Sequence, residues 1–165
     1  MVGIIILQIV LIILNAIFSS AEISVISMNE TKIKQMAEEG DRRAEKAVLL
    51  LEKPAKFLEA IQAAVTFAGL LSGAFVAVYF AEFVKSVVLE GFAGKMIVSE
   101  QVIYGVSVFV VTLILTYVNL LFGEILPKRA AMSKSEDDAF KMIGILFLAA
   151  KLFAPLAGLL HISSN

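Results

Sequence analysis

Three long apolar stretches alternate with shorter charged stretches along the 165 residues. The first, residues 2–28, is almost wholly apolar up to Phe18 and then becomes small and polar. Residues 57–83 and 101–126 form the second and third stretches. About 20 apolar residues cross the hydrocarbon core of a bilayer as a helix, so each stretch is long enough. The pattern therefore predicts an all-α protein with three membrane-spanning helices.

The segment between the first two spans, residues 29–56, has a different pattern. It carries seven Lys or Arg and six acidic residues, and its apolar positions recur at helical spacing. Gly40 and Asp41 divide the segment, and Pro54 follows its second half. We expect two amphipathic helices at the membrane surface, each with a solvated charged face.

The last apolar stretch, residues 139–160, is ambiguous. Lys141 and Lys151 leave nine uncharged residues between them, about 14 Å of helix, and Pro155 and Gly158 interrupt the pattern further. A lysine near the middle of a span costs roughly 2.5–3.5 kcal/mol on insertion scales. We expect residues 127–160 to form a juxtamembrane or re-entrant belt, and a fourth span is the alternative.

The loops differ in basic charge, which predicts an orientation. Seven Lys or Arg lie in 29–56, two in the loop 84–100, and four soon after the third span. Because basic loops stay in the cytoplasm, we expect the N-terminus outside and both juxtamembrane segments inside. This is the pattern of a multi-pass protein of the cell membrane.

Composition supports a membrane protein and excludes several kinds of chemistry. The chain is 59% hydrophobic with a mean hydropathy of +0.91, and its 18% of charged residues lies below the roughly 25% of soluble domains. A net charge of −1 gives no basic field for nucleic acid. There is no cysteine and one histidine, His161, so thiolate sites are excluded and a serine hydrolase lacks its histidine partner. We therefore expect no enzyme.

Hydroxyl groups gather at the end of the first span. Ser20, Ser24 and Ser27 share one helical face, Ser19 lies beside it, and Glu22 points toward the opposite face. Serines inside membrane helices are costly unless they bind something or hydrogen-bond to the carbonyl four residues earlier. Both interpretations stay open for these serines.

Two further polar features lie in the other spans. Gly69 and Gly73 form a GxxxG pattern around Ser72, which favours either a close helix contact, such as a dimer seam, or backbone carbonyls that face an ion. Glu124 follows a charge-free run from Gln101 to Gly123, and its alternative role is an interfacial pair with Lys128.

The intramembrane donors are therefore almost all oxygens. Asn15 and Asn119 add amide oxygens to the hydroxyls and the Glu124 carboxylate. Such a set suits a hard cation such as Mg²⁺ or Ca²⁺ and excludes a soft-metal site.

Three segments also resemble one family. Residues 14–24 (LNAIFSSAEIS) resemble the first transmembrane helix of the CorC/CorB and cyclin M (CNNM) magnesium transporters, and residues 60–75 (AIQAAVTFAGLLSGAF) resemble the second. Residues 122–128 (FGEILPK) are similar to the family's Gly-Glu-x-x-Pro-Lys signature. Each motif is modest alone, but the three together, in this order, are specific.

The resemblance implies a fold and a set of partners. It implies that residues 1–165 form a CNNM-type transmembrane domain, a homodimer in the lipid bilayer with three spans per subunit. In the family, two cytoplasmic CBS domains bind ATP, and we expect this chain to be the transmembrane part without them.

The resemblance also implies a function. It implies magnesium transport, as Mg²⁺ export, with Na⁺ as a coupling ion that the residues leave open. The transported Mg²⁺ would be dehydrated between the helices. The metal ligands implied by motif position are Ser19, Ser20, Ser24, Gly69, Ser72 and Glu124. The alternative is a membrane-embedded regulator or scaffold that senses Mg²⁺ without transporting it.

Overall fold

The computed structural model describes residues 2–52, 54–91, 99–133 and 136–164. Within these ranges every regular element is a helix, and no strand occurs. The elements, in chain order, are α1 (Val2–Ile26), α2 (Glu30–Glu38), α3 (Arg42–Glu52), α4 (Pro54–Leu71), η1 (Ser72–Ala77), α5 (Val78–Gly91), α6 (Glu100–Leu120), η2 (Leu121–Ile125), α7 (Leu126–Met132) and α8 (Glu136–Ser164). The predicted all-α class is confirmed.

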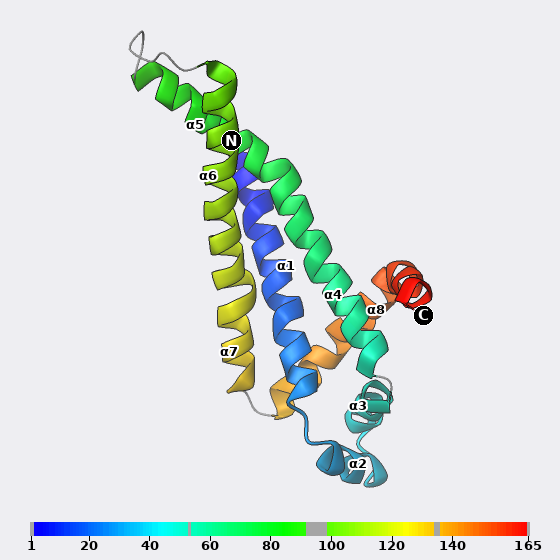
Figure 1. Cartoon of the computed structure of the whole chain (residues 1–165). Coiled ribbons are helices and arrows are strands. Elements are labelled where there is room, and N and C mark those ends of the chain that lie inside the picture. Colours follow the sequence, from blue (N-terminus) through cyan, green and yellow to red (C-terminus); the bar gives the residue numbers. More distant parts are fainter. Residues whose placement is uncertain (1, 53, 92–98, 134–135, 165) are drawn as a thin grey trace.

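Three long helical runs are apolar enough to cross a membrane: Val2–Ile26, Phe57–Gly91 and Glu100–Met132. They lie side by side, with α1 between α4 on one side and the α6–α7 run on the other (Figure 1). Large apolar side chains such as Val2, Phe109 and Tyr117 remain well exposed on their outer faces. Exposed apolar residues on parallel long helices are what hydrocarbon requires, so the three-span prediction is confirmed.

Two of these runs are longer than expected. The second was expected to end at residue 83, with a polar loop over 84–100, but its helix continues to Gly91 because Val87, Val88 and Leu89 keep it apolar. The third continues past residue 126 to Met132. Pro127 stands in the first turn of α7, where a missing backbone N–H is tolerated.

Within the predicted segment 29–56, residues up to Glu52 form the expected pair of helices, α2 and α3, while residues 54–56 already belong to α4. Their position at the membrane surface stays a prediction. Gly40, with φ of +91°, makes the turn between α2 and α3, a backbone conformation that favours glycine. The N–H of Asp41 donates to the carbonyl of Met36 at 3.0 Å and closes the end of α2. Helix α2 packs against α3, and α3 packs against α8. The three helices contribute to one buried cluster that includes Ile33, Ala44, Ala47, Leu50, Phe140, Ile143 and Leu146.

Helix α8 runs obliquely past the ends of α1 and α4 and packs against both (Figure 1). It is continuous through Pro155, where an interruption was expected. Proline removes one helical hydrogen bond, and the contacts of α8 with α4 offset that loss. Within the part of the chain that the structure describes, α8 is not among the three helices that are long and apolar enough to cross a membrane. The juxtamembrane or re-entrant belt expected over 127–160 stays a prediction.

We expect α8 to begin and end on the same side of the membrane. The chain has no cysteine, so a single introduced cysteine is the only thiol that a reagent can label. Ser163→Cys should react with an impermeant thiol reagent from the side that labels Lys34→Cys, and Glu90→Cys should react from the other side. Labelling of Ser163→Cys together with Glu90→Cys would mean a fourth span.

Candidate functional site

A stripe of polar side chains runs along one face of α1. Gln8, Asn15, Ser19 and Glu22 are spaced by 7, 4 and 3 residues, which places them within one narrow sector of the helix. We call these four residues the α1 polar stripe. It extends over about 21 Å of helix, against a hydrocarbon core of about 30 Å. The stripe therefore covers most of the membrane's depth.

The end of the stripe nearest the N-terminus contacts the second span. The Ser72 hydroxyl donates to the Gln8 side-chain oxygen at 2.7 Å, and both residues are buried. Ser72 is the first residue of η1, a π-helical turn. The Gln8 amide nitrogen is buried without a hydrogen-bond partner among the described residues. Gln8 thus lies in an apolar helix with half of its amide unsatisfied.

The middle of the stripe contacts the third span. The Asn15 amide nitrogen donates to the Asn119 side-chain oxygen at 3.4 Å. Gly123 fits closely beside them, since a Cβ there would lie 3.0 Å from that Asn119 oxygen and 3.1 Å from the Asn15 Cβ. Glycine at 123 therefore permits the close approach of η2 to α1.

The other end of the stripe, at Glu22, carries charge. Lys128 Nζ lies 3.0 Å from a Glu22 oxygen and 2.9 Å from a Glu124 oxygen. All three side chains are between one fifth and one third exposed. The group holds two negative charges and one positive charge, a net −1, at the end of two apolar helices. The carboxylates converge here because η2 presents Glu124 to the same face of α1 that carries Glu22.

The serines predicted as ligands divide into two groups. The hydroxyls of Ser20 and Ser24 donate to backbone carbonyls, of Pro127 at 3.4 Å and of Ser20 at 2.8 Å. The Ser27 hydroxyl likewise donates to the Ser24 carbonyl at 3.2 Å. Ser19 differs, because its hydroxyl is fully buried and has no partner in the described part of the chain. Of the predicted serines on α1, Ser19 is thus the one whose hydroxyl is not engaged by backbone, while the Ser72 hydroxyl donates to the Gln8 side chain.

All three buried side-chain atoms that lack a hydrogen-bond partner belong to the stripe, as far as the described residues extend. They are the Gln8 nitrogen, the Asn15 oxygen Oδ1 and the Ser19 hydroxyl. A buried polar group without a partner costs about 1–3 kcal/mol. Native proteins rarely retain such groups, and those that do occur mark strain, an unplaced ion or water, or a functional site. These three unpartnered atoms of the stripe are therefore available to bind a ligand.

The second and third spans are both irregular beside the stripe. The two π-helical turns, η1 (Ser72–Ala77) and η2 (Leu121–Ile125), each pack against α1. Single π-helical turns inside α-helices frequently lie at functional sites. A cavity of about 240 Å³ lies between η1 and α6, and the predicted residues Gly69 and Ser72 line it with Thr112, Thr116 and Asn119.

The donor set is poor in charge. Among the described residues there is no cluster of three or more His, Cys, Asp or Glu side chains. A cation held here would use neutral oxygens of the stripe with the Glu124 or Glu22 carboxylates. Mg²⁺ prefers such oxygen ligands. In this structure the carboxylates are paired with Lys128, which is the alternative role that the sequence allowed for Glu124.

Gln8 and Lys128 were not predicted as site residues. Gln8, Asn15 and Glu22 are seven residues apart in sequence, a repeat that places them on one helical face. That spacing was readable before the structure. The contact of Lys128 with Glu22 was not, because it depends on how η2 and α7 pack against α1.

We expect Gly123→Ala to disturb the contact between η2 and α1. The added methyl group must displace Asn15 or Asn119, and overpacking of this kind costs about 1–3 kcal/mol. The melting temperature in detergent should fall. Gly105→Ala is the matched control, since a Cβ there meets nothing within 4 Å and alanine favours the helix. Equal melting temperatures for the two variants would contradict the close fit at Gly123.

Comparison with known proteins agrees with this architecture. The chain is 36% identical to a UPF0053 protein of Synechocystis over 161 residues, which is 94% of this chain and 34% of that protein. It is 27% identical to a polyamine export protein of Haemophilus influenzae, covering 88% of this chain and 32% of that one. A UPF0053 inner membrane protein of Escherichia coli is also 27% identical, over 90% of this chain and 30% of the other.

The chain spans about a third of the length of these relatives. Their shared region coincides with the helical domain described above. The family model for the cyclin M transmembrane N-terminal domain matches residues 6–165, which includes all three spans and α8. The chain therefore belongs to the cyclin M (CNNM) transmembrane-domain family.

Proposed function

We propose that this chain is the membrane domain of a transporter that moves Mg²⁺ along the α1 polar stripe. The observation that carries the proposal is the set of buried, unpartnered oxygens at Asn15 and Ser19, about two helical turns and one helical turn from a pair of carboxylates. Oxygen atoms in that order offer successive ligands to a hard cation. Membership of the cyclin M family supports a role in the membrane.

Charge explains why such a site would transport an ion rather than store it. Lys128 neutralises one of the two carboxylates, so Glu22, Glu124 and Lys128 together carry a net −1. A bound Mg²⁺ would bring the net charge of this group to +1. If Lys128 instead moves out to water, Mg²⁺ and the two carboxylates would carry no net charge. Both states cost free energy at low dielectric, which keeps binding weak enough for release.

The predicted ligands take graded roles in this proposal. Glu124 supplies the charge, Ser19 and Ser72 supply hydroxyls, and Gly69 beside the π-helical turn leaves room for backbone carbonyls. Ser20 and Ser24 would first have to give up their hydrogen bonds to backbone. We therefore expect them to matter less than Ser19.

A second substrate class has one specific observation in its favour. The Glu22 and Glu124 carboxylates already hold an ammonium group, that of Lys128, at 3.0 and 2.9 Å. A polyamine would present the same group, and a relative from Haemophilus influenzae is named a polyamine export protein. We keep polyamine transport as the alternative, and a Mg²⁺-sensing regulator without transport as the third.

Flux measurements on the purified chain in liposomes distinguish these functions. We expect Mg²⁺ flux in the parent, a loss of at least ten-fold in Glu124→Gln, a smaller loss in Ser19→Ala, and a still smaller loss in Ser24→Ala. Ser107→Ala is the control, because Ser107 is a buried serine whose hydroxyl donates to the Ile103 carbonyl of its own helix.

Each alternative has its own outcome. Flux of spermidine without flux of Mg²⁺ would show that the substrate is a polyamine and not Mg²⁺. Calorimetric Mg²⁺ binding without any flux would favour the regulator. If Glu124→Gln transports Mg²⁺ as fast as the parent, Glu124 is an interfacial residue and the proposed path is wrong.

The proposal includes a second copy of the chain. Gly73 has open space where its Cβ would stand, so the contacts within one subunit do not require glycine there. A close contact between the small-residue faces of two subunits would require glycine at this position. The mass of the purified chain in detergent tests this homodimer, and a monomer alone would contradict it.

A further inference from the structure

A pocket at the end of the bundle that carries α3 is separate from the α1 polar stripe. It has a volume of about 590 Å³ and lies between α3 and the first half of α8. The described residues that line it include three cations, four large apolar side chains and a glycine, with no acid: Arg43, Lys46, Lys141, Leu49, Phe140, Ile143, Phe147 and Gly144. Such a lining combines positive charge with apolar walls.

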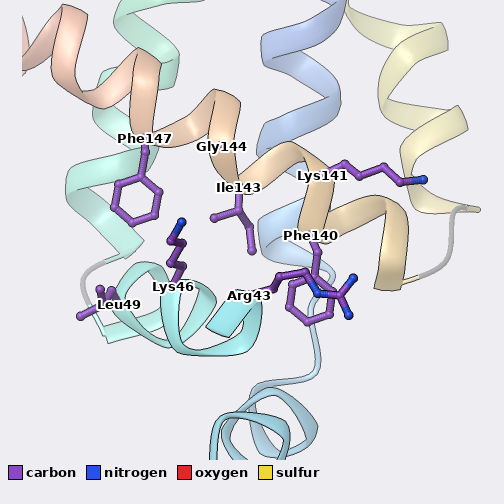
Figure 2. Close-up of a pocket in the computed structure, with 8 residues that line it drawn as sticks. All are labelled: Arg43, Lys46, Leu49, Phe140, Lys141, Ile143, Gly144 and Phe147. Atoms are coloured by element: carbon purple, nitrogen blue, oxygen red, sulfur yellow. The ribbon is translucent and has the colours of Figure 1, made fainter. Parts of the chain in front are cut away.

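Two of the cations lie beside apolar side chains of the pocket, and the third points away from it. Figure 2 shows Lys46 extending from α3 toward Phe147, and Arg43 beside the Phe140 ring, while Lys141 points away toward the neighbouring helices. The Arg43 guanidinium carbon stands 5.3 Å from the centre of the Phe140 ring. Arg43 also donates to the Asp41 carboxylate at 3.0 Å, and these hydrogen bonds hold the pKa of Asp41 below its usual value. Arg43 is thereby held in place at the pocket.

The part of the pocket near Phe147 lies beside the start of a membrane span. The Phe147 ring stacks edge-on against Phe57 at 5.3 Å, and the second span begins at Phe57. Leu49, on the turn of α3 after Lys46, is 55% exposed. An exposed leucine next to a span is typical of a surface in contact with acyl chains, and a lysine one turn away is typical of contact with headgroups.

We propose that this pocket binds an anionic phospholipid of the adjacent leaflet. The headgroup phosphate contacts Lys46 and Arg43, and the start of an acyl chain lies against Leu49 and Phe147. Basic pockets between helices at this depth suit anionic headgroups, and each Lys or Arg near such a surface strengthens binding by about five-fold. By joining α3 to α8, the lipid would stabilise the surface helices against the bundle.

Native mass spectrometry of the purified chain in detergent tests the proposal with phosphatidylglycerol and phosphatidylcholine of equal chain length. We expect the parent to prefer phosphatidylglycerol and Lys46→Gln to lose about five-fold of that affinity. Arg42→Gln is the matched control, since it removes one exposed cation from α3 outside the pocket.

A second variant blocks the pocket and keeps every charge. A Cβ at Gly144 meets nothing within 4 Å, so Gly144→Leu adds a side chain that fills free space and favours the helix. It should weaken phosphatidylglycerol binding by at least five-fold, while Gly105→Leu, which adds leucine on α6 far from the pocket, should not.

Three results would overturn the assignment. One is equal affinity for the two lipids in the parent. Another is unchanged phosphatidylglycerol affinity in both Lys46→Gln and Gly144→Leu. The last is full competition by inorganic phosphate or glycerol phosphate at the same concentration as the lipid, which would make the ligand a free phosphate. A fall in lipid affinity for the pocket variants alone supports the proposal.

Discussion

Polar side chains inside a membrane can be satisfied only by the protein itself or by what it carries, because hydrocarbon offers no hydrogen bonds. That constraint governs how the helices of this chain pack. Three of the four residues of the α1 polar stripe face a polar residue of another span: Gln8 faces Ser72, Asn15 faces Asn119, and Glu22 faces Lys128. The contacts align the three spans, and the apolar faces are left for lipid.

The pairing of polar side chains between the spans is incomplete, and the unpaired groups point to function. The Asn15 oxygen and the Ser19 hydroxyl stay buried and unpartnered in the described part of the chain. The spans beside them are not regular helices but contain π-helical turns, at Ser72–Ala77 and Leu121–Ile125. A π-helical turn widens the backbone and changes which carbonyls and side chains face a neighbour. The proposed path for a dehydrated cation would use this irregular backbone together with the unsatisfied oxygens.

The sequence predicted much of the fold because the governing signals are local. Apolar stretches of sufficient length define the spans, and the turn at Gly40 with Pro54 bounds the surface helices. The ends of the spans were harder, since Val87 to Leu89 extend one helix and Pro127 stands in a helical first turn that proline tolerates.

The site could be predicted only in part. Helical spacing drew attention to Ser20, Ser24 and Ser27, but a serine can satisfy itself on its own backbone, so spacing cannot say whether its hydroxyl is available. The amide of Gln8 and the carboxylate of Glu22 cannot be satisfied in that way within a membrane helix. Their heptad relation to Asn15 was therefore the stronger signal, and the approach of Lys128 depended on packing that only the structure gives.

The central claim is that a cation occupies the stripe next to Glu124. The most direct measurement is anomalous X-ray diffraction from crystals of the chain soaked with Mn²⁺, which prefers the same oxygen ligands as Mg²⁺. The account predicts a peak between α1 and η2, within coordination distance of a Glu124 oxygen and of an oxygen of the stripe, with Lys128 moved away. A Glu124 still paired with Lys128, and no peak among the spans at saturating Mn²⁺, would contradict it.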